Sequence, residues 1–293
     1  MAAATWALAH QFREELDLVN ALELFEALSG SLADAHQQTQ QAAIDRGIPS
    51  FLSAFLPKSA GTYLHGRLVA AAATEIFNHT QNPIDYDAQA YLVAGWLRLF
   101  LRGGASCHTH LRPTPWNVRV LNQSGARKIW VHVRDPRQVA LSAYWHGQGK
   151  GQGSGEAARE RAAMEAEMRA IHQAKIGGIY HYDMPKDEQL RNFFEKFLTW
   201  ITAWREAQER LSPEILFTTY EQMLSDREGF ERKVLSFHGA AQLRGIFSEA
   251  VTPQDRFRSG KSDEWRTELD KPTRDWMSDQ MPAETLAAFG WER

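Results

Sequence analysis

The sequence predicts an α/β fold in which a parallel β-sheet is flanked by helices. Three short runs, at 50–56, 128–133 and 214–219, indicate buried strands, and the second of them is both apolar and rich in β-branched residues. Stretches with helical spacing of apolar residues separate them, and this alternation of strands and helices favours a parallel sheet covered on both faces. The length of 293 residues fits one large domain. We expect a helical N-terminal extension over 1–48 and a single α/β domain over 49–293.

The helices follow from apolar periodicity and from turn residues. Leucines recur at helical spacing within 5–46, and the SGS at 29–31 interrupts them. Asp135 and Pro136 begin a helix directly after the second strand, because proline suits the first helical turn. The nine residues GQGKGQGSG around 147–155 are expected to be the most flexible part of the chain. The other predicted helices cover 62–77, 88–102, 156–175, 193–211, 227–238 and 240–250.

Composition excludes several classes of protein. Thirty-three basic residues against 36 acidic ones give a net charge of -3, which argues against general nucleic-acid binding. Cys107 stands alone, so no internal disulfide can form. The N-terminus lacks a basic region ahead of an apolar core, and no stretch approaches the roughly 18 apolar residues that span a bilayer. We therefore expect a cytoplasmic protein.

The turn after the first strand carries an unusual set of polar residues. The segment FLPKSAGTYLH at 55–65 places Lys58, Ser59, Gly61 and Thr62 within five residues. Backbone N–H groups at a strand-to-helix turn face outward at the positive end of the helix dipole, which makes an anion site, most often for phosphate. The lysine adds a positive charge and the hydroxyls add donors. A tight turn with a solvated lysine would contain the same residues, so the turn alone leaves both interpretations open.

The turn differs from the ordinary nucleoside-triphosphate loop. That loop reads G-x-x-x-x-G-K-[ST], whereas here the lysine precedes the glycine. No obvious acidic residue at a strand end would hold magnesium. The turn is therefore P-loop-like without being the loop of an ATPase.

A second candidate anion site follows the second strand. In VHVRDPRQVALSAYWH, Arg134 ends the strand, Arg137 follows, and Ser142 lies two turns into the next helix. A surface ion pair would explain these residues equally well. In a parallel sheet, however, both turns open at the carboxyl edge, where ligands bind. Two anion sites on one edge suggest a ligand with two separated phosphates.

These segments resemble the motifs of the sulfotransferases that use 3′-phosphoadenosine 5′-phosphosulfate (PAPS). LPKSAGTYL resembles their 5′-phosphosulfate loop, P-K-[ST]-G-T-[ST]-W, and VRDPRQVALSAYWH resembles their 3′-phosphate motif. FRSGKSDEW at 257–265 resembles R-K-G-x-x-G-D-W, and ILFTTYEQM at 215–223 resembles a strand that ends in Y-E-D-M. FGWER at 289–293 resembles the L-G-Y ending. The matches keep the family's order from about residue 50 to the end.

The resemblance implies a P-loop-like parallel sheet, PAPS as co-substrate and no metal. It assigns cofactor binding to residues of the 5′-phosphosulfate loop, the 3′-phosphate motif, the tyrosine after the third strand and the C-terminal motif. These are Lys58, Ser59, Ala60, Gly61, Thr62, Tyr63, Arg134, Ser142, Tyr220, Arg258, Ser259 and Gly260.

The chain departs from the family pattern at several of these positions. Ala60-Gly61 stands for Gly-Thr, and Tyr63 stands for the tryptophan near the adenine. Gln138 replaces an aspartate of the 3′-phosphate motif. Ser259 replaces the lysine of R-K-G, and Lys261 is a candidate to compensate. These changes bear on cofactor affinity more than on the class of protein.

The implied reaction moves a sulfuryl group to an acceptor hydroxyl or amine. Like phosphoryl transfer, it depends on in-line positioning and charge stabilisation, and Lys58 is the residue expected to meet the developing charge. CHTHLRP resembles the family's K-T-H-L-P, so His110 aligns with the catalytic base and His108 takes the place of the lysine as a candidate substrate contact. A pair of ordinary loop histidines is the alternative. The His-x-His spacing has no convincing third metal ligand.

The acceptor is expected to be a small molecule, a lipid or a carrier-bound metabolite, and the oligomeric state is open. Two other functions fit the residues. One is a P-loop kinase acting on a small hydroxyl compound, which the missing G-K-[ST] disfavours. The other is a non-catalytic nucleotide-binding protein with the same fold, which the changes at Gln138 and Ser259 allow.

Overall fold

The computed structural model describes most of the predicted α/β domain. The described residues are 38–72, 75–76, 80–81, 91–92, 94–147, 184–247 and 260–293. Most of the predicted N-terminal extension lies outside them, and its described part, 38–48, begins with a helix at 38–45. The glycine-rich stretch after residue 147 and the helix predicted at 156–175 also lie outside the described residues.

The sheet is parallel, as the sequence predicted, and its strands follow the order β1-β6-β7. Two smaller pairs accompany it, with β2 parallel to β5 and β3 antiparallel to β4. The chain after β5 runs beside β1, because the N–H of Phe51 donates to Ala105 O and that of Phe55 donates to Thr109 O, both at 2.8 Å. The strands are β1 (Ser53–Phe55), β2 (Glu75–Ile76), β3 (Thr80–Gln81), β4 (Tyr91–Leu92), β5 (Ala105–Ser106), β6 (Lys128–Val133) and β7 (Glu214–Thr219).

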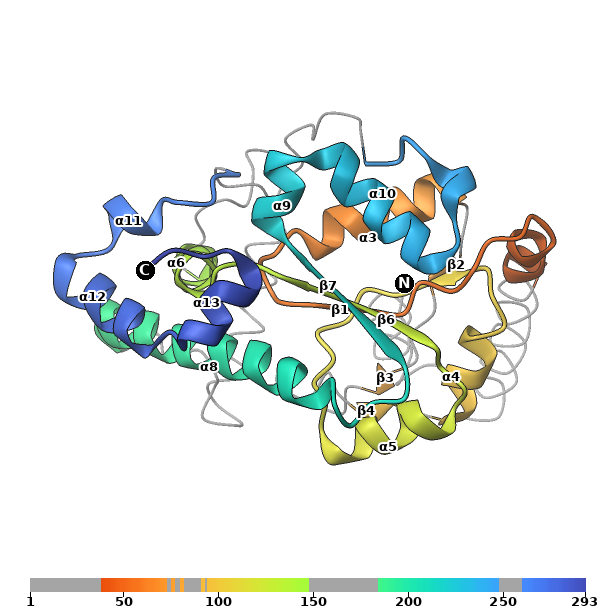
Figure 1. The fold of residues 1–293 in the computed structure, drawn as a ribbon, viewed down its shortest axis with the longest axis horizontal. Helices are drawn as coiled ribbons and strands as arrows, with labels where there is room; N and C mark the ends of the chain where they lie inside the picture. The colour runs from red at the N-terminus through yellow and green to blue at the C-terminus, as the bar shows by residue number, and fades with distance from the viewer. Residues whose placement is uncertain are drawn as a thin grey trace, which may run out of the picture.

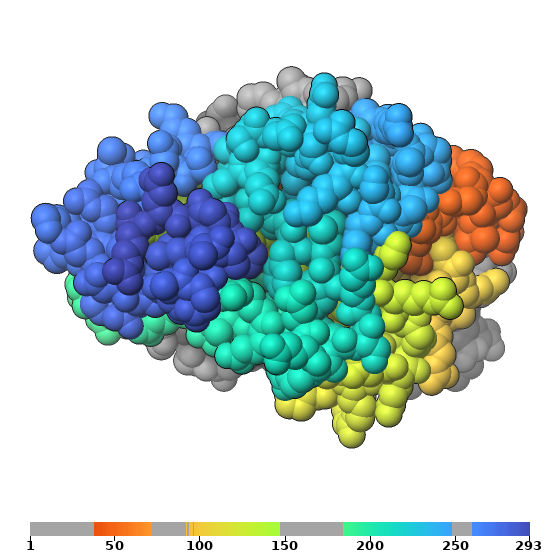
Figure 2. Space-filling model, in the orientation of Figure 1, coloured from red at the N-terminus to blue at the C-terminus, as the bar shows by residue number. Residues whose placement is uncertain are grey.

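Helices cover both faces of this sheet (Figure 1). In that view α3, α9 and α10 lie above the strands, and α4, α5 and α8 lie below them. Figure 2 shows the C-terminal residues, in blue, forming one end of the molecule beside the green residues of α8. The helices are α3 (Gly61–Ala72), α4 (Ala94–Phe100), α5 (Pro115–Gln123), α6 (Pro136–Gly147), α8 (Lys186–Ala207), α9 (Tyr220–Ser225), α10 (Arg227–His238), η2 (Ala241–Leu243), α11 (Trp265–Glu268), α12 (Lys271–Gln280) and α13 (Ala283–Phe289).

Alternation along the strands produces a separate core on each face of the sheet. In β6, Ile129, Val131 and Val133 belong to the cluster with α6, α8 and the C-terminal helices. Trp130, between them, belongs to the cluster with α3, α9 and α10. Successive strand side chains point to opposite faces, so a strand buried on both sides is apolar along its whole length. Cys107 is a core residue, and burial raises the pKa of its thiol to about 11.

Some predicted elements differ from the observed ones. The helix predicted at 62–77 ends at Ala72, and the one predicted at 193–211 spans Lys186–Ala207. The helix predicted at 240–250 is wrong over 241–247, where a 3-10 turn and irregular turns stand instead. Its regular hydrogen bonds are replaced, because the Glu231 carboxylate accepts the N–H groups of Gly245 and Phe247. None of the described helices has the length and apolarity needed to cross a bilayer.

Two histidines, His132 and His238, are buried against the sheet. The His238 ring lies 4.8 Å from that of Phe51, measured between centroids. Burial, together with the positive charges of Arg134 beside His132 and Lys128 beside His238, lowers the pKa of each imidazole to about 3. Both rings are therefore neutral in the folded protein at neutral pH.

We predict that the free energy of unfolding decreases as the pH falls from about 6.5 toward about 3. In this window the unfolded chain binds protons on these histidines and the folded chain does not, so their contribution to stability is complete above pH 6.5 and is lost in acid. Urea unfolding at several pH values measures the slope. His238→Phe, compared with the wild type at pH 8 for its packing cost, should flatten the slope between pH 6.5 and 4. An unchanged slope would contradict the assignment.

Candidate active site

The turn between β1 and α3 has a strained backbone. Lys58 and Ala60 have φ angles of 64° and 71°, in the left-handed region that costs roughly 1–2 kcal/mol for a residue with a Cβ. Ser59 between them is fully buried, and its N–H and its hydroxyl both donate to Leu56 O, at 3.2 and 2.6 Å. Strain of this kind persists only where surrounding contacts fix the backbone, and it is concentrated at functional sites.

Ala60 is the residue that precedes the first turn of α3. Its carbonyl accepts the N–H of Leu64 at 3.1 Å, so it occupies the N-cap position. Serine, threonine, asparagine or aspartate is usual there, because their oxygens accept first-turn N–H groups, and an alanine methyl cannot do this. The start of α3 therefore combines the helix dipole with a cap that has no acceptor of its own, which suits an anionic ligand.

Gly61 is required by what packs against it. A Cβ atom on this residue would lie 2.7 Å from Nε2 of His108 and 2.8 Å from Cβ of Phe55. Both distances are shorter than ordinary van der Waals contacts. This chain has Ala60-Gly61 where the motif it resembles has Gly-Thr. The glycine leaves room for the imidazole of His108, which itself stands where that family's pattern has a lysine.

Arg134 joins the two predicted anion sites. Its guanidinium donates to Lys58 O at 2.9 Å and to Lys261 O, and it stacks on Tyr220 with 4.1 Å between Cζ and the ring centroid. Arg134 is only 6% exposed, and its Nε has no hydrogen-bond partner among the described residues. A buried guanidinium N–H that lacks an acceptor marks a position that an anion can fill.

Tyr220 connects this arginine to the C-terminal motif. The tyrosine is buried, and its hydroxyl donates to Gly260 O at 2.8 Å. The turn at 58–63, Arg134, Tyr220 and Gly260 are therefore brought together from four separate segments. Ser142 lies half-buried on α6. Arg258 and Ser259 lie outside the described residues.

The segment 107–113 (CHTHLRP), here called the histidine segment, runs beside β1. Nδ1 of His110 lies 2.7 Å from Phe55 O, and because a carbonyl only accepts, Nδ1 carries the proton. This tautomer leaves the lone pair on Nε2, which is the nitrogen that can act as a base. The ring of His108 lies 5.2 Å from that of His110. Two indoles of α8 hold the backbone here, as Trp200 and Trp204 donate to the carbonyls of His110 and Leu111 at 3.2 and 2.9 Å.

Burial is the main cause that lowers the pKa of His110. The positive charges of Lys58 and of Lys196 on α8 lower it further, and the hydrogen bond to Phe55 partly opposes them. The imidazole is therefore neutral at neutral pH. Within the described residues, no group of three or more His, Cys, Asp or Glu side chains is arranged to hold a metal ion.

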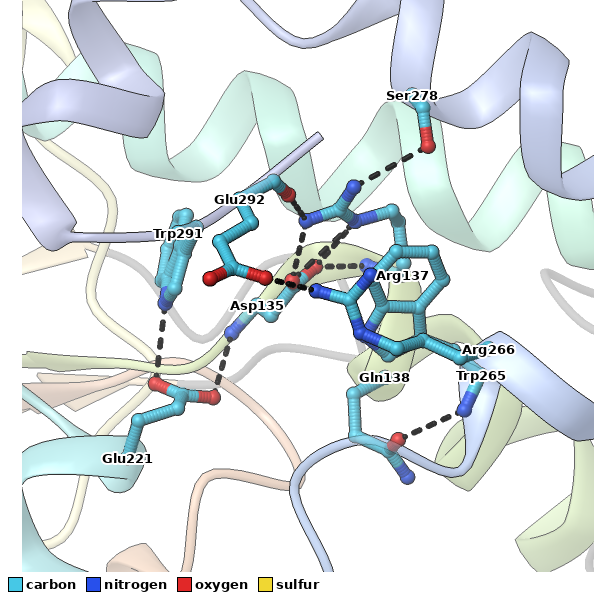
Figure 3. A network of polar contacts seen from close by, with 9 residues as sticks. All are labelled: Asp135, Arg137, Gln138, Glu221, Trp265, Arg266, Ser278, Trp291 and Glu292. Atoms are coloured by element: carbon cyan, nitrogen blue, oxygen red, sulfur yellow. Dashed lines mark hydrogen bonds and ion pairs between the residues drawn. The ribbon is translucent and has the colours of Figure 1, made fainter. Parts of the chain in front are cut away.

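A buried network fixes the turn after Arg134 (Figure 3). Arg137 and Asp135 form a buried ion pair, with 2.6 Å between Nη2 and Oδ2. The same guanidinium donates to Ser278 Oγ and Glu292 O and stacks on Trp265 at 3.8 Å. Asp135 Oδ1 also accepts the N–H of Arg137 at 2.9 Å, so Asp135 caps α6 as predicted. The C-terminal residues are thereby attached to the start of α6.

Gln138 and Glu221 extend this network. The Gln138 side chain accepts the N–H of Trp265 at 3.1 Å and donates to Glu264 at 3.1 Å. Glu221 accepts the N–H of Asp135 and the indole N–H of Trp291, at 3.2 and 3.1 Å. Gln138, which departs from the family motif, therefore holds the C-terminal motif in place by a pair of amide hydrogen bonds.

Comparison with known proteins agrees with this geometry. The sequence model for the sulfotransferase domain matches residues 105–253, just over half of the chain. The chain belongs to the sulfotransferase domain family. A search of curated proteins found no match. Among solved structures, the crystal structure of mouse sulfotransferase SULT7A1 complexed with PAP matches with a TM-score of 0.51 and 15% identity, over 81% of this chain and 84% of that chain.

This sulfotransferase fold places several residues at the site that the sequence analysis did not select. Trp200 and Trp204 are buried in the core, and their indole N–H groups also orient the backbone of His110 and Leu111. Glu221 follows Tyr220 directly, inside the Y-E-D-M-like motif, so its position was a usable signal. Arg137 was recognised only as a second basic residue, and its partners more than 100 residues away could not be read from the sequence.

We predict that Gly61→Ala destabilises the protein by roughly 1–3 kcal/mol, because the new methyl group must displace His108 or Phe55. Gly66→Ala in the same helix is the matched control. Nothing lies within 4 Å of a Cβ at Gly66, so alanine there should stabilise the helix by up to about 1 kcal/mol. Denaturant unfolding measures both changes, and equal effects for the two variants would contradict the close packing of His108.

Proposed function

We propose that this chain transfers a sulfuryl group from PAPS to a hydroxyl or amine of a small-molecule, lipid or carrier-bound acceptor. One observation carries the proposal. The buried Arg134, which has an Nε without a partner among the described residues, is bonded to the backbone of Lys58, so two anion-binding segments from separate strands meet at one edge of the sheet. Such a site fits a nucleotide with phosphate groups at both its 3′ and 5′ positions.

The residues divide into two groups around the proposed nucleotide. The N–H groups at the start of α3, with Lys58 and Thr62, would hold the 5′-phosphosulfate, while Ser59 is committed to shaping the turn. Arg134, supported by Tyr220, would hold the 3′-phosphate, together with Ser142 and the C-terminal residues Arg258, Ser259 and Gly260. Ala60 and Gly61 would contact the nucleotide through their backbone, and Tyr63 would contact it through its ring. The solved structure of the mouse relative is a complex with PAP.

The chain's own groups supply the remaining chemistry. Nε2 of His110 would take the proton of the acceptor hydroxyl as its oxygen bonds to sulfur, and the electrons of the breaking S–O bond would pass to the 5′-phosphate. The Lys58 ammonium would stabilise the negative charge that develops there. His108, which packs closely against Gly61, would contact the transferring group or the acceptor. The nucleotide supplies the sulfuryl group and leaves as PAP.

Thermal unfolding with PAP, ADP and ATP tests the cofactor. At about 100 times its dissociation constant, a bound nucleotide adds roughly 2.7 kcal/mol, which raises the melting temperature by at least about 2 °C in a chain of this size. We expect such a shift with PAP, independent of magnesium, and a smaller one with ADP. A shift with magnesium-ATP alone would favour the kinase alternative, and PAP binding without turnover on a broad panel of phenols, sterols, sugars and amines would favour the non-catalytic one.

We predict that His110→Ala abolishes sulfuryl transfer while PAP binding is retained, because the variant removes the base and leaves the anion contacts intact. In the wild type, kcat/KM should fall in acid with an apparent pKa below the ordinary histidine value of about 6.5, since burial and two lysines lower the pKa of His110. Turnover with a fixed acceptor and PAP titration give the two measurements. Near-normal turnover of His110→Ala would exclude His110 as the base.

A further inference from the structure

His132 lies directly beneath the strained turn. It is the penultimate residue of β6 and is fully buried, with its ring 6.1 Å from that of Phe55 and 5.6 Å from that of Phe230. Its Nε2 lies 2.9 Å from Ser59 O, and its Nδ1 lies 2.8 Å from Thr218 Oγ1 on β7. A single imidazole thus connects the neighbouring strand to the backbone of the turn.

These contacts fit only one arrangement of protons. Ser59 O can only accept, so Nε2 of His132 carries the hydrogen, and Nδ1 must then accept from the hydroxyl of Thr218. The same hydroxyl accepts the indole N–H of Trp130 at 2.7 Å. A continuous chain of hydrogen bonds therefore runs from Trp130 through Thr218 and His132 to Ser59. The pKa of His132, lowered to about 3 by burial, keeps the imidazole in this neutral form.

The carbonyl of Ser59 belongs to the peptide unit that also contains the N–H of Ala60. The C=O and N–H of a trans peptide point in opposite directions. When His132 draws the carbonyl inward, the N–H of Ala60 is turned outward, toward the start of α3. Rotation of this peptide also sets φ of Ala60, whose left-handed value of 71° is unfavourable for alanine.

Hydrogen bonds also fix the preceding peptide, Lys58–Ser59, through its carbonyl and its N–H. The carbonyl of Lys58 accepts from Arg134, and the N–H of Ser59 donates to Leu56 O. His132 fixes the next peptide, Ser59–Ala60, through its bond to Ser59 O. We propose that His132 is a positioning residue, which holds the Ser59–Ala60 peptide in the orientation that binds the 5′-phosphosulfate. The identity of that ligand rests on the proposed function, whereas the peptide orientation does not.

Two amide variants test the contacts of the two ring nitrogens of His132 separately. The amide of His132→Gln can place a donor where Nε2 lies and keep the bond to Ser59 O. The shorter amide of His132→Asn reaches only the Thr218 side and loses Ser59. Both leave a polar amide in the same buried place, so they differ mainly in the contact that carries the proposal.

The readout is the ratio of the dissociation constants for adenosine 3′-monophosphate and PAP, because only PAP has the 5′-phosphate. For His132→Asn we expect PAP binding to weaken about tenfold or more, with binding of the 3′-monophosphate changed less than about threefold. His132→Gln should keep a ratio within about threefold of the wild type. Thr285→Val is the control, because it removes a buried hydroxyl bonded to Arg205 on α8. It should lower the stability of the protein and leave the ratio of the two dissociation constants unchanged.

A crystal structure of each variant completes the test without reference to activity. In His132→Asn the φ of Ala60 should leave the left-handed region, and in His132→Gln it should stay there. An unchanged φ in His132→Asn, or an equal loss of affinity for both nucleotides, would reject the positioning role. If the wild type does not bind PAP, the proposed function fails, and the φ of Ala60 in the two variants still decides the role of His132.

Discussion

The parallel pairing of β6 between β1 and β7 is the constraint on which the rest of the structure depends. Its register sets His132 opposite both Phe55 and Thr218, so the three strands end at the same level of the sheet. Each strand then continues directly into a residue of the site. β1 leads to the strained turn, β6 to Arg134 and β7 to Tyr220. A change of register by one residue would send His132 to the opposite face and separate the two segments that we propose bind the phosphate groups.

Around this edge, the side chains that contact the proposed nucleotide are supported by others that do not. Arg134 lies between Tyr220 and the backbone of Lys58 and Lys261, and His110 is fixed by Phe55 and by an indole of α8. Most of these bonds end on backbone carbonyls, so they depend on the path of the chain more than on the identity of the partner side chain. The close packing at Gly61, in contrast, is a side-chain constraint and leaves no room for a Cβ.

The sequence predicted the elements whose signals are local. The three central strands lie where the apolar runs predicted them, and Asp135 with Pro136 begins α6 as expected. The helix α5 was missed, although Thr114 and Pro115 form a regular cap and first turn. What remained hidden depends on contacts between distant residues. His108 packs against Gly61, and His132 links Thr218 to Ser59. The Glu231 carboxylate binds backbone N–H groups where a helix was predicted. Each contact joins segments that are separated in the chain.

The attachment of Glu292 to Arg137 has a consequence for how the protein folds. The bond closes a loop of 155 residues, and the indole of Trp291 reaches Glu221 across 70. Contacts of such long sequence separation form slowly, because the chain must lose the entropy of closing the loop before the contact can stabilise it. The local turns, such as the cap of α6, can form early. The contact of Arg137 with Glu292 closes a longer loop than the pairing of β6 with β1 or β7, so we expect the C-terminal residues to attach after the central sheet has formed.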